Sequence, residues 1–405
     1  MIDSYSIKKD FPIFNATGGR GRDLIYLDSA ASAQKPLTVI EAISAYYSGY
    51  YSNTGRGLYW PATAASKALQ AAREKVAGFI GADSPEVIFT GGTTSGINSL
   101  ANSLLFSSLT EGDEIVVSVL EHHSNFLPWK QWCQDRGARL RVVPLTEDHT
   151  LDVEAFGELV GEKTKLVALS AVSNVTGAVQ EIRKLADIAH AKGVPVLIDA
   201  AQWVAHGPVD VREIDCDFMA FSGHKLYGPT GIGVLYIRSD HHKKLRPFHF
   251  GGGMVMEVSE ESMTFKDSPG KFEGGTGNIA GAIGLAAAVE YLSEIGMEKV
   301  HPYLSSLTRY LKQGLQGMEG VDLVGDTDNQ GPVVSFLTEG IHPHDMAGFL
   351  GEKGIAIRAG HHCAQPLMSS LNLTGTCRAS LGIYNHEEDI DKLLDGIREA
   401  RDFFI

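Results

Sequence analysis

Short runs of β-branched and other apolar residues alternate with segments of helical periodicity between about residues 86 and 237. The runs are EVIFT, EIVVSV, RLRVV, KLVALS, VPVLID, DFMAF and IGVLYI. This alternation predicts a mostly parallel, seven-stranded sheet covered by helices, the α/β class. The last run follows DFMAFSGHK too closely for a helical crossover, so we expect that strand to be antiparallel.

Two of the intervening segments place their apolar residues on one helical face. One lies between Ser95 and Phe106, and the other contains Ile182, Leu185, Ala186 and Ala189. Spacings of three and four residues bring such positions together on a helix, so both segments are predicted to pack on the sheet.

The pattern changes beyond about residue 265. AGAIGLAAAVEYLSEI and the stretch 303–316 are typical of helices, GPVVSFL and GIAIRAG of strands, and a closing helix is predicted from His386. We therefore expect a large domain over residues 22–264 and a smaller α+β domain over 265–405. Residues 1–21 contain too few apolar positions to fold alone and are predicted to pack against one of the two.

Composition narrows the class of protein. The chain has 405 residues, of which 43% are hydrophobic, and a formal charge of -14. An acidic chain repels nucleic acid and anionic membranes, so neither is an expected partner. No run approaches the roughly 18 apolar residues of a membrane span, and no export signal is recognisable. The four cysteines form no C-x-x-C pair, which favours a reducing compartment, and we expect the cytoplasm.

A glycine turn between a strand and a helix is the first candidate for chemistry. VIFTGGTTSGIN spans residues 87–98 and places Thr93 and Thr94 where a helix begins. Free N–H groups and the helix dipole attract a phosphate at such a position. Thr94 or Ser95 acting only as an N-cap is the alternative, and the motif alone does not decide between them.

Two further candidates stand at the ends of successive predicted strands. Asp199 ends VLID, at the edge where open α/β sheets hold ligands and where a buried carboxylate needs a cation. Lys225 follows DFMAFSGH, where burial and neighbouring cations lower the pKa of an amine enough for imine formation.

A phosphate cradle, a buried acid and an imine-forming lysine at neighbouring strand ends describe a pocket for pyridoxal 5'-phosphate (PLP). An acid facing the pyridine nitrogen keeps it protonated, and the lysine holds the cofactor covalently. His122 of EHHSN, at another strand end, is suited to stacking on a flat ring and moving protons. The alternative for His122 is a surface histidine bonded to backbone.

RAGHHCAQPL, residues 358–367, sets Cys363 behind two histidines in a predicted loop. The residues alone allow a nucleophile, a metal ligand or a bystander. A zinc site would use His361, His362, Cys363 and Cys377. Adjacent His and Cys side chains rarely point at one ion and the spacing matches no zinc pattern, which disfavours that interpretation.

Several motifs together resemble the class V aminotransferase family, and within it the group II (Suf-type) cysteine desulfurases. They are YLDSAASAQKP, EHHSN, SNVTG, DAAQ, FSGHKLYGPTGIG, RAGHHCAQPL and CRASLGIYN, and the similarity runs almost end to end. The resemblance implies a fold-type I PLP-dependent transferase that acts as a homodimer. It also implies conversion of L-cysteine to L-alanine, with the sulfur passed as a persulfide to an acceptor protein in iron–sulfur cluster assembly.

The resemblance also implies roles for individual residues. Cys363 would attack the substrate sulfur, and His361, His362 and Arg358 are candidate cations for its thiolate. In the cofactor site Lys225 would form the imine, Asp199 would pair with the ring nitrogen, Gln202 would bond the phenolic oxygen and His122 would stack on the ring. The phosphate would be held by Thr94, Ser222, His224 and, from the neighbouring subunit, Thr276. The substrate would be bound by Arg378, Asn174 and Arg358.

The chain departs from the family pattern at two places. GRGLY puts Gly55 and Tyr59 where the family often has histidines, and GTGN replaces the usual GTPN. These positions are expected near the entrance of the active site or the dimer contact, so they bear on access, acceptor choice and turnover rate. A selenocysteine lyase, a class V aminotransferase and a non-enzymatic metal-binding or scaffold protein remain alternatives at this stage.

Overall fold

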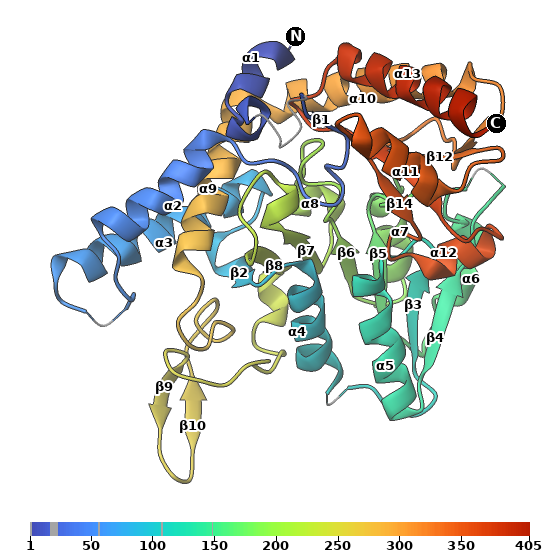
Figure 1. Cartoon of the computed structure of the whole chain (residues 1–405). Coiled ribbons are helices and arrows are strands. Elements are labelled where there is room, and N and C mark those ends of the chain that lie inside the picture. Colours follow the sequence, from blue (N-terminus) through green and yellow to red (C-terminus); the bar gives the residue numbers. More distant parts are fainter. Residues whose placement is uncertain (1, 17–22, 56, 107, 148) are drawn as a thin grey trace.

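The structure is a computed structural model that describes residues 2–16, 23–55, 57–106, 108–147 and 149–405. Figure 1 shows a central sheet flanked by helices, with both termini at the same end of the molecule. The helices are α1 Ser4–Lys9, α2 Leu37–Gly49, α3 Trp60–Phe79, α4 Thr93–Leu105, α5 Leu127–Arg136, α6 Val153–Leu159, α7 Ile182–His190, α8 Val211–Ile214, α9 Ile279–Ile295, α10 Met297–Gln316, α11 Pro343–Glu352, α12 Gln365–Ser370 and α13 Glu387–Phe404.

A seven-stranded sheet forms the centre of the described chain. Its strands are β2 Val87–Thr90, β3 Glu114–Ser118, β4 Arg139–Val143, β5 Thr164–Ser170, β6 Val196–Asp199, β7 Phe218–Ser222 and β8 Gly233–Ile237. Their order is β2-β8-β7-β6-β5-β3-β4, and β8 runs antiparallel to both neighbours. The predicted sheet, its seven strands and the antiparallel last strand are therefore confirmed.

Helices cover both faces of this sheet because its strands are apolar on both sides. Ile115 and Val117 of β3 pack with α4 and α5, whereas Val116 between them packs into the other main cluster with α7. Both predicted covering helices are present, as α4 and α7. A continuous apolar run is what a strand buried on two faces requires.

A second, four-stranded antiparallel sheet has the order β11-β12-β15-β14. Its strands are β11 Val321–Val324, β12 Val333–Thr338, β15 Thr376–Ser380 and β14 Arg358–Gly360. The predicted strand 354–360 is wrong as one element: it divides into β13 Ile355–Ala356, which pairs with β1 Ile25–Tyr26, and β14, which joins the sheet. The closing helix α13 begins after His386, as predicted.

The two ends of the chain and one hairpin complete the architecture. In the described part of the first 21 residues, Lys8 forms an ion pair with Asp389 of α13, and Phe11 packs against Tyr227 and Tyr384. The hairpin of β9 Val255–Val258 and β10 Met263–Phe265 projects from the body (Figure 1). α9 packs on α2 and α3, and the domain boundary at residue 265 stays a prediction.

Among the described residues, no single helix is long and apolar enough to cross a membrane. Within the same described residues, α9 and α10 meet the length and composition criterion only when taken together, and that pair is bent by 80°.

Candidate active site

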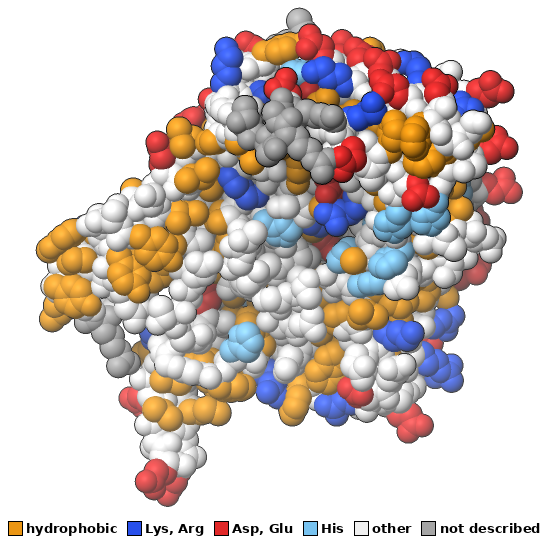
Figure 2. All heavy atoms as spheres, viewed as in Figure 1, with side chains coloured by type: hydrophobic (Ala, Val, Ile, Leu, Met, Phe, Trp, Pro, Cys, Tyr) orange, Lys and Arg blue, Asp and Glu red, His pale blue; other side chains and the backbone are white. Residues whose placement is uncertain are grey.

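A cavity of about 510 Å³ lies where the carboxyl ends of the large sheet's strands meet β14 and β15. On this face histidine side chains gather beside Lys or Arg side chains below α11 (Figure 2). Parallel strands bring their carboxyl ends to one edge, so strand-end residues far apart in sequence converge there. The predicted site residues that line the cavity are Thr94, His122, Asn174, Asp199, Gln202, Ser222, His224, Lys225, Arg358, Cys363 and Arg378.

Asp199, which is buried, and Lys225, which is partly buried, both line the cavity at these strand ends, and their charges attract each other. Burial raises the pKa of Asp199, and the Ala201 N–H and the charge of Lys225 only partly oppose that rise. Burial lowers the pKa of Lys225 to about 8, against the attraction of Asp199 and with help from Arg378. The lysine therefore has a neutral, nucleophilic fraction near neutral pH.

The start of α4 forms a cradle against the end of β7. The Thr93 N–H donates to Ser222 Oγ at 2.8 Å, and the two hydroxyl oxygens lie 2.7 Å apart. The N-cap is Gly92, at φ +142, and a Cβ there would meet Ser222 Oγ at 3.2 Å. The N-cap alternative for Thr94 and Ser95 is therefore wrong. The sequence places Thr93 at the start of this helix but gives no sign of its backbone contact with Ser222.

His122 and His224 are both neutral in this environment. Burial, reinforced by the charge of Lys225, lowers the pKa of His122 to about 3 and that of His224 to about 4. His122 Nδ1 accepts from the Ser124 N–H at 3.1 Å, so the ring hydrogen is on Nε2. Ser124 Oγ lies 2.6 Å from Thr94 Oγ1. His122 thus bonds to backbone, as its alternative stated, and it also lines the cavity.

Two side-chain amides connect the cavity walls. Gln202 Nε2 donates to Ala30 O at 2.8 Å, and Asn174 Nδ2 donates to His362 O at 2.7 Å. Both amides come from segments that directly follow strands of the large sheet, and both hold backbone from other parts of the chain. These bonds tie the N-terminal segment and the Cys363 loop to the sheet.

Asp28 is a site residue that the sequence interpretation missed. Arg358 and Arg378 are direct cross-strand partners in β14 and β15, and like charges in that arrangement repel. Asp28 lies between them: Arg358 Nη2 donates to its Oδ2 at 2.8 Å and Arg378 Nη2 to its Oδ1 at 3.1 Å. Arg378 is buried, and its Nε has no hydrogen-bond partner among the residues that the structure describes. The residue also lines the cavity, where a guanidinium suits the carboxylate of a ligand.

Cys363 is exposed and lines the cavity, whereas Cys133, Cys216 and Cys377 are buried. Burial, with Arg378 nearby, lowers the pKa of His362 to about 3. This lowered pKa disfavours His362 as a source of positive charge for the Cys363 thiolate. No group of three or more His, Cys, Asp or Glu among the described residues is arranged to hold a metal ion.

Thr276 is the one predicted site residue that lies elsewhere. It lines a second cavity of about 710 Å³ together with Asn53 and Gly55. Its predicted role was in a neighbouring subunit, which a single chain does not test. Tyr59 accepts a hydrogen bond from Ser52 Oγ at 3.1 Å.

The donor set of the first cavity fits PLP. It offers a buried acid for a ring nitrogen, an amine with a lowered pKa for an aldehyde carbon, and hydroxyls with a helix start for a phosphate. The guanidinium of Arg378, which lines the same cavity, is a suitable group for the carboxylate of an amino acid.

Residues 25–393 match the family described as Aminotransferase class-V. A relative from Halalkalibacterium halodurans described as a probable cysteine desulfurase is 46% identical over 404 residues, with 100% of this chain and 99% of that protein covered. A solved cysteine desulfurase from Escherichia coli is 38% identical, with a TM-score of 0.93 and all of both chains covered. One from Thermococcus onnurineus is 36% identical, with a TM-score of 0.94 and 98% of each chain covered.

Proposed function

The chain belongs to the class-V aminotransferase family, and we propose that it is a cysteine desulfurase. Its substrate is L-cysteine, its product is L-alanine, and the sulfur remains on Cys363 as a persulfide. The family has the fold-type I architecture and the PLP cofactor that the sequence motifs implied. The relatives described as cysteine desulfurases share the whole length of this chain, which supports carrying their activity over.

One observation carries the proposal: the exposed thiol of Cys363 shares a cavity with the carboxyl group of Asp199 and the amine of Lys225. Transamination needs the acid and the amine but has no use for a cysteine. A thiol in the same cavity can receive sulfur from a substrate held by the other two groups. The other three cysteines are buried, so this role falls on Cys363.

Each cavity residue has a part in this reaction. Bound PLP withdraws electron density from the bonds at the substrate Cα. Lys225 would hold the cofactor covalently, Asp199 would keep its ring nitrogen protonated, and Gln202 and His122 would contact the ring. The hydroxyls of Thr94 and Ser222 bind the phosphate with His224. Arg378 binds the substrate carboxylate, with Asn174 and Arg358 beside it.

The sulfur step balances without an external oxidant or reductant. The Cys363 thiolate forms an S–S bond with the substrate sulfur as the substrate Cβ–S bond breaks. The electron pair of that bond stays with carbon, which takes up a proton to give the methyl group of alanine. Cysteine and the Cys363 thiol thus become alanine and a Cys363 persulfide, which is then available to an acceptor protein in iron–sulfur cluster assembly.

A homodimer is part of the proposal. Exposed apolar side chains gather around the arm formed by α2 and α3 (Figure 2): Leu37, Ile40, Tyr47, Tyr51, Leu58, Tyr59 and Trp60. A contiguous group of exposed apolar side chains is typical of a protein interface. Thr276 lies beside Asn53, just beyond the end of α2, and the family resemblance implies that it reaches the phosphate of the neighbouring subunit. The four unpaired cysteines favour the cytoplasm as the site of action.

The test is an assay of alanine and sulfide formation from L-cysteine, with and without a reductant. Cys363→Ala is expected to lower alanine formation by at least about 10²-fold, because no thiol remains to accept the sulfur. Cys133→Ala, which removes a buried thiol, is the matched control and should retain most activity. In the wild type, a reductant-labile sulfur should add mass to the Cys363 peptide. Added mass on another cysteine would contradict the assignment.

A further inference from the structure

The nucleophile stands in an unusual stretch of backbone. His362 and Cys363 have φ values of +52 and +56, in the left-handed region that residues with a Cβ rarely adopt. Two such residues in succession persist only where the surroundings hold them. The contacts of this loop therefore determine where the Cys363 thiol lies.

Side-chain and backbone contacts hold the loop on both sides of Cys363. The Cys363 N–H donates to His361 Nδ1 at 3.0 Å, and the Cys363 carbonyl accepts from the His123 N–H at 2.8 Å. Before it, the His362 carbonyl accepts from Asn174 Nδ2 at 2.7 Å. The bond from His361 spans two residues and closes a turn of the kind that Asn and Asp side chains close.

His123 extends the same arrangement beyond the nucleophile. Its Nε2 lies 3.4 Å from the Gln365 N–H, which donates to it, and its ring is 5.9 Å from the ring of His361. Each histidine accepts a backbone N–H with one ring nitrogen. The ring hydrogen is therefore on Nε2 of His361 and on Nδ1 of His123.

We propose that His361, assisted by His123, is a positioning residue for the nucleophile. It fixes the Cys363 N–H, keeps the left-handed turn closed and thereby sets the place of the thiol in the cavity. The inference rests on the proposed sulfur transfer and assigns neither histidine a proton in the reaction. Without the bond to His361 Nδ1, the turn relaxes towards ordinary φ values and the thiol leaves its place.

Amide side chains test this inference because Asn and Gln imitate different ring nitrogens. Asn places an oxygen at the δ position and Gln at the ε position. His361→Asn should therefore keep the acceptor for the Cys363 N–H, and His361→Gln should lose it. The reverse holds for His123, where Gln should keep the acceptor for the Gln365 N–H and Asn should lose it. The two positions thus serve as matched controls for each other.

Two measurements on the cofactor-loaded protein report the outcome. In His361→Gln, kcat for alanine formation should fall about tenfold with KM for cysteine within about twofold, as expected when one hydrogen bond of typical strength is lost. Amide hydrogen exchange of the peptide that contains Cys363 should accelerate by a similar factor. His361→Asn should resemble the wild type in both. At position 123 the loss should be about threefold and confined to Asn, because that bond is longer.

Equal effects of Asn and Gln at position 361 would overturn the inference, whether both variants are impaired or neither is. So would a fall in kcat without faster exchange, which indicates a direct role in proton transfer. Equal thermal midpoints of the two position 361 variants show that folding does not explain a difference between them. If His361→Gln fails to fold, the pair at position 123 decides. Failure of the proposed function itself is distinguishable, because alanine formation would then survive Cys363→Ala.

Discussion

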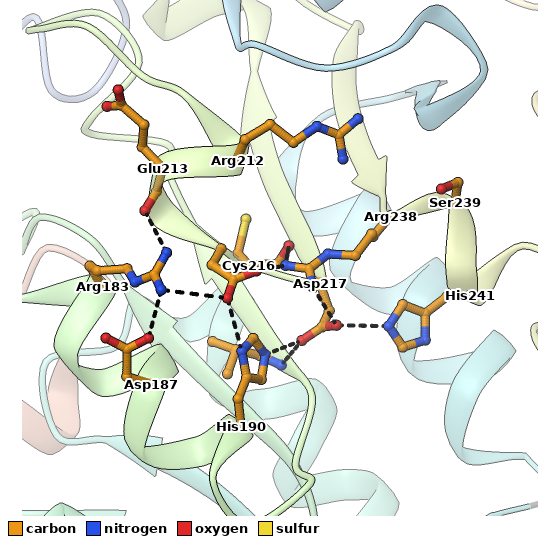
Figure 3. Close-up of polar contacts among 12 residues, drawn as sticks. Arg183, Asp187, His190, Arg212, Glu213, Cys216, Asp217, Arg238, Ser239 and His241 are labelled. Carbon is orange, nitrogen blue, oxygen red and sulfur yellow. Dashed lines mark hydrogen bonds and ion pairs between the residues drawn. The ribbon is translucent and has the colours of Figure 1, made fainter.

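A buried aspartate lies at the carboxyl ends of the strands of the large sheet, and another lies at their amino ends. The two aspartates differ in their hydrogen-bond partners. Asp199 ends β6 at the carboxyl edge, whereas Asp217 precedes β7 at the amino edge. Asp217 accepts hydrogen bonds at 2.8 Å from His190 Nε2, His241 Nε2 and the Val196 N–H, as Figure 3 shows for the two histidines. Asp199 has one partner among the described residues, the Ala201 N–H at 2.9 Å.

The pKa values move in opposite directions as a result. Burial favours the neutral form of both acids. At Asp217 the hydrogen bonds from His241, His190 and the Val196 N–H, with the charge of Arg238, outweigh burial and lower the pKa to about 2. At Asp199 burial prevails and the pKa is raised. A saturated acid stabilises the fold, whereas an acid short of partners is available to a ligand.

The largest expected effect is on activity at Asp199. Asp199→Asn should lower kcat by about 10²- to 10³-fold, because the charge facing the cofactor ring is lost. The free energy of unfolding of the cofactor-free protein should change by about 1 kcal/mol or less, because burial already disfavours the carboxylate and Lys225 can release its proton. Steady-state kinetics and urea denaturation measure the two. A large loss of stability would show that Asp199 is structural after all.

Asp217→Asn should show the opposite pattern. The amide cannot accept from all the N–H donors that face it, so the free energy of unfolding should fall by about 3 kcal/mol. The residue lies across the sheet from the cavity, so kcat at a temperature where both proteins are folded should stay within about twofold. Asp187→Asn is the control, because that carboxylate forms an exposed ion pair with Arg183, and its thermal midpoint should not move.

The sequence predicted which residues meet at the carboxyl ends of the strands but not which residues meet at their amino ends. Asp199 and Lys225 follow apolar strands within VLIDAAQ and FSGHK, so the rule that carboxyl ends meet at one edge was enough to bring them together. The cluster around Asp217 joins the ends of α7 and β8 to the start of β7. No local pattern marks residues that meet only because antiparallel β8 returns to the amino edge.

Other omissions have separate physical reasons. Asp28 became a site residue through a bridge between its segment and Ser380, a contact across 352 positions that no periodicity reveals. α2 and α3 were not predicted, because Leu37, Ile40, Tyr47 and other apolar side chains there are exposed and blur the helical pattern. The left-handed backbone at Cys363 is held by the nearby His361 and by Asn174 and His123, which come from distant segments.

Acid should remove the stability that Asp217 contributes at the amino ends of the strands, but none at Asp199. The pKa of Asp217 is lowered from 3.8 to about 2, so its carboxylate stabilises the fold above pH 4, and this contribution is lost as the pH falls towards 2. The loss amounts to about 2 kcal/mol. Asp199, with its raised pKa, has the opposite sign and loses no stability on protonation. The free energy of unfolding measured from pH 5 to 2 should therefore fall less steeply in Asp217→Asn than in the wild type.

The smallest effect concerns whether Asp217 needs charged partners or only donors. His241→Gln keeps an N–H at the ε position and should cost about 0.5 kcal/mol, whereas His241→Leu removes the donor and should cost about 1 to 2 kcal/mol. Urea denaturation of both variants at pH 7 measures the difference. The His241 ring also packs against Phe218, with centroids 4.8 Å apart. If His241→Gln lowers the free energy of unfolding as much as His241→Leu does, then His241 contributes ring packing or imidazolium charge and not its N–H. The hydrogen bonds to Asp217 would then no longer explain the contrast with Asp199.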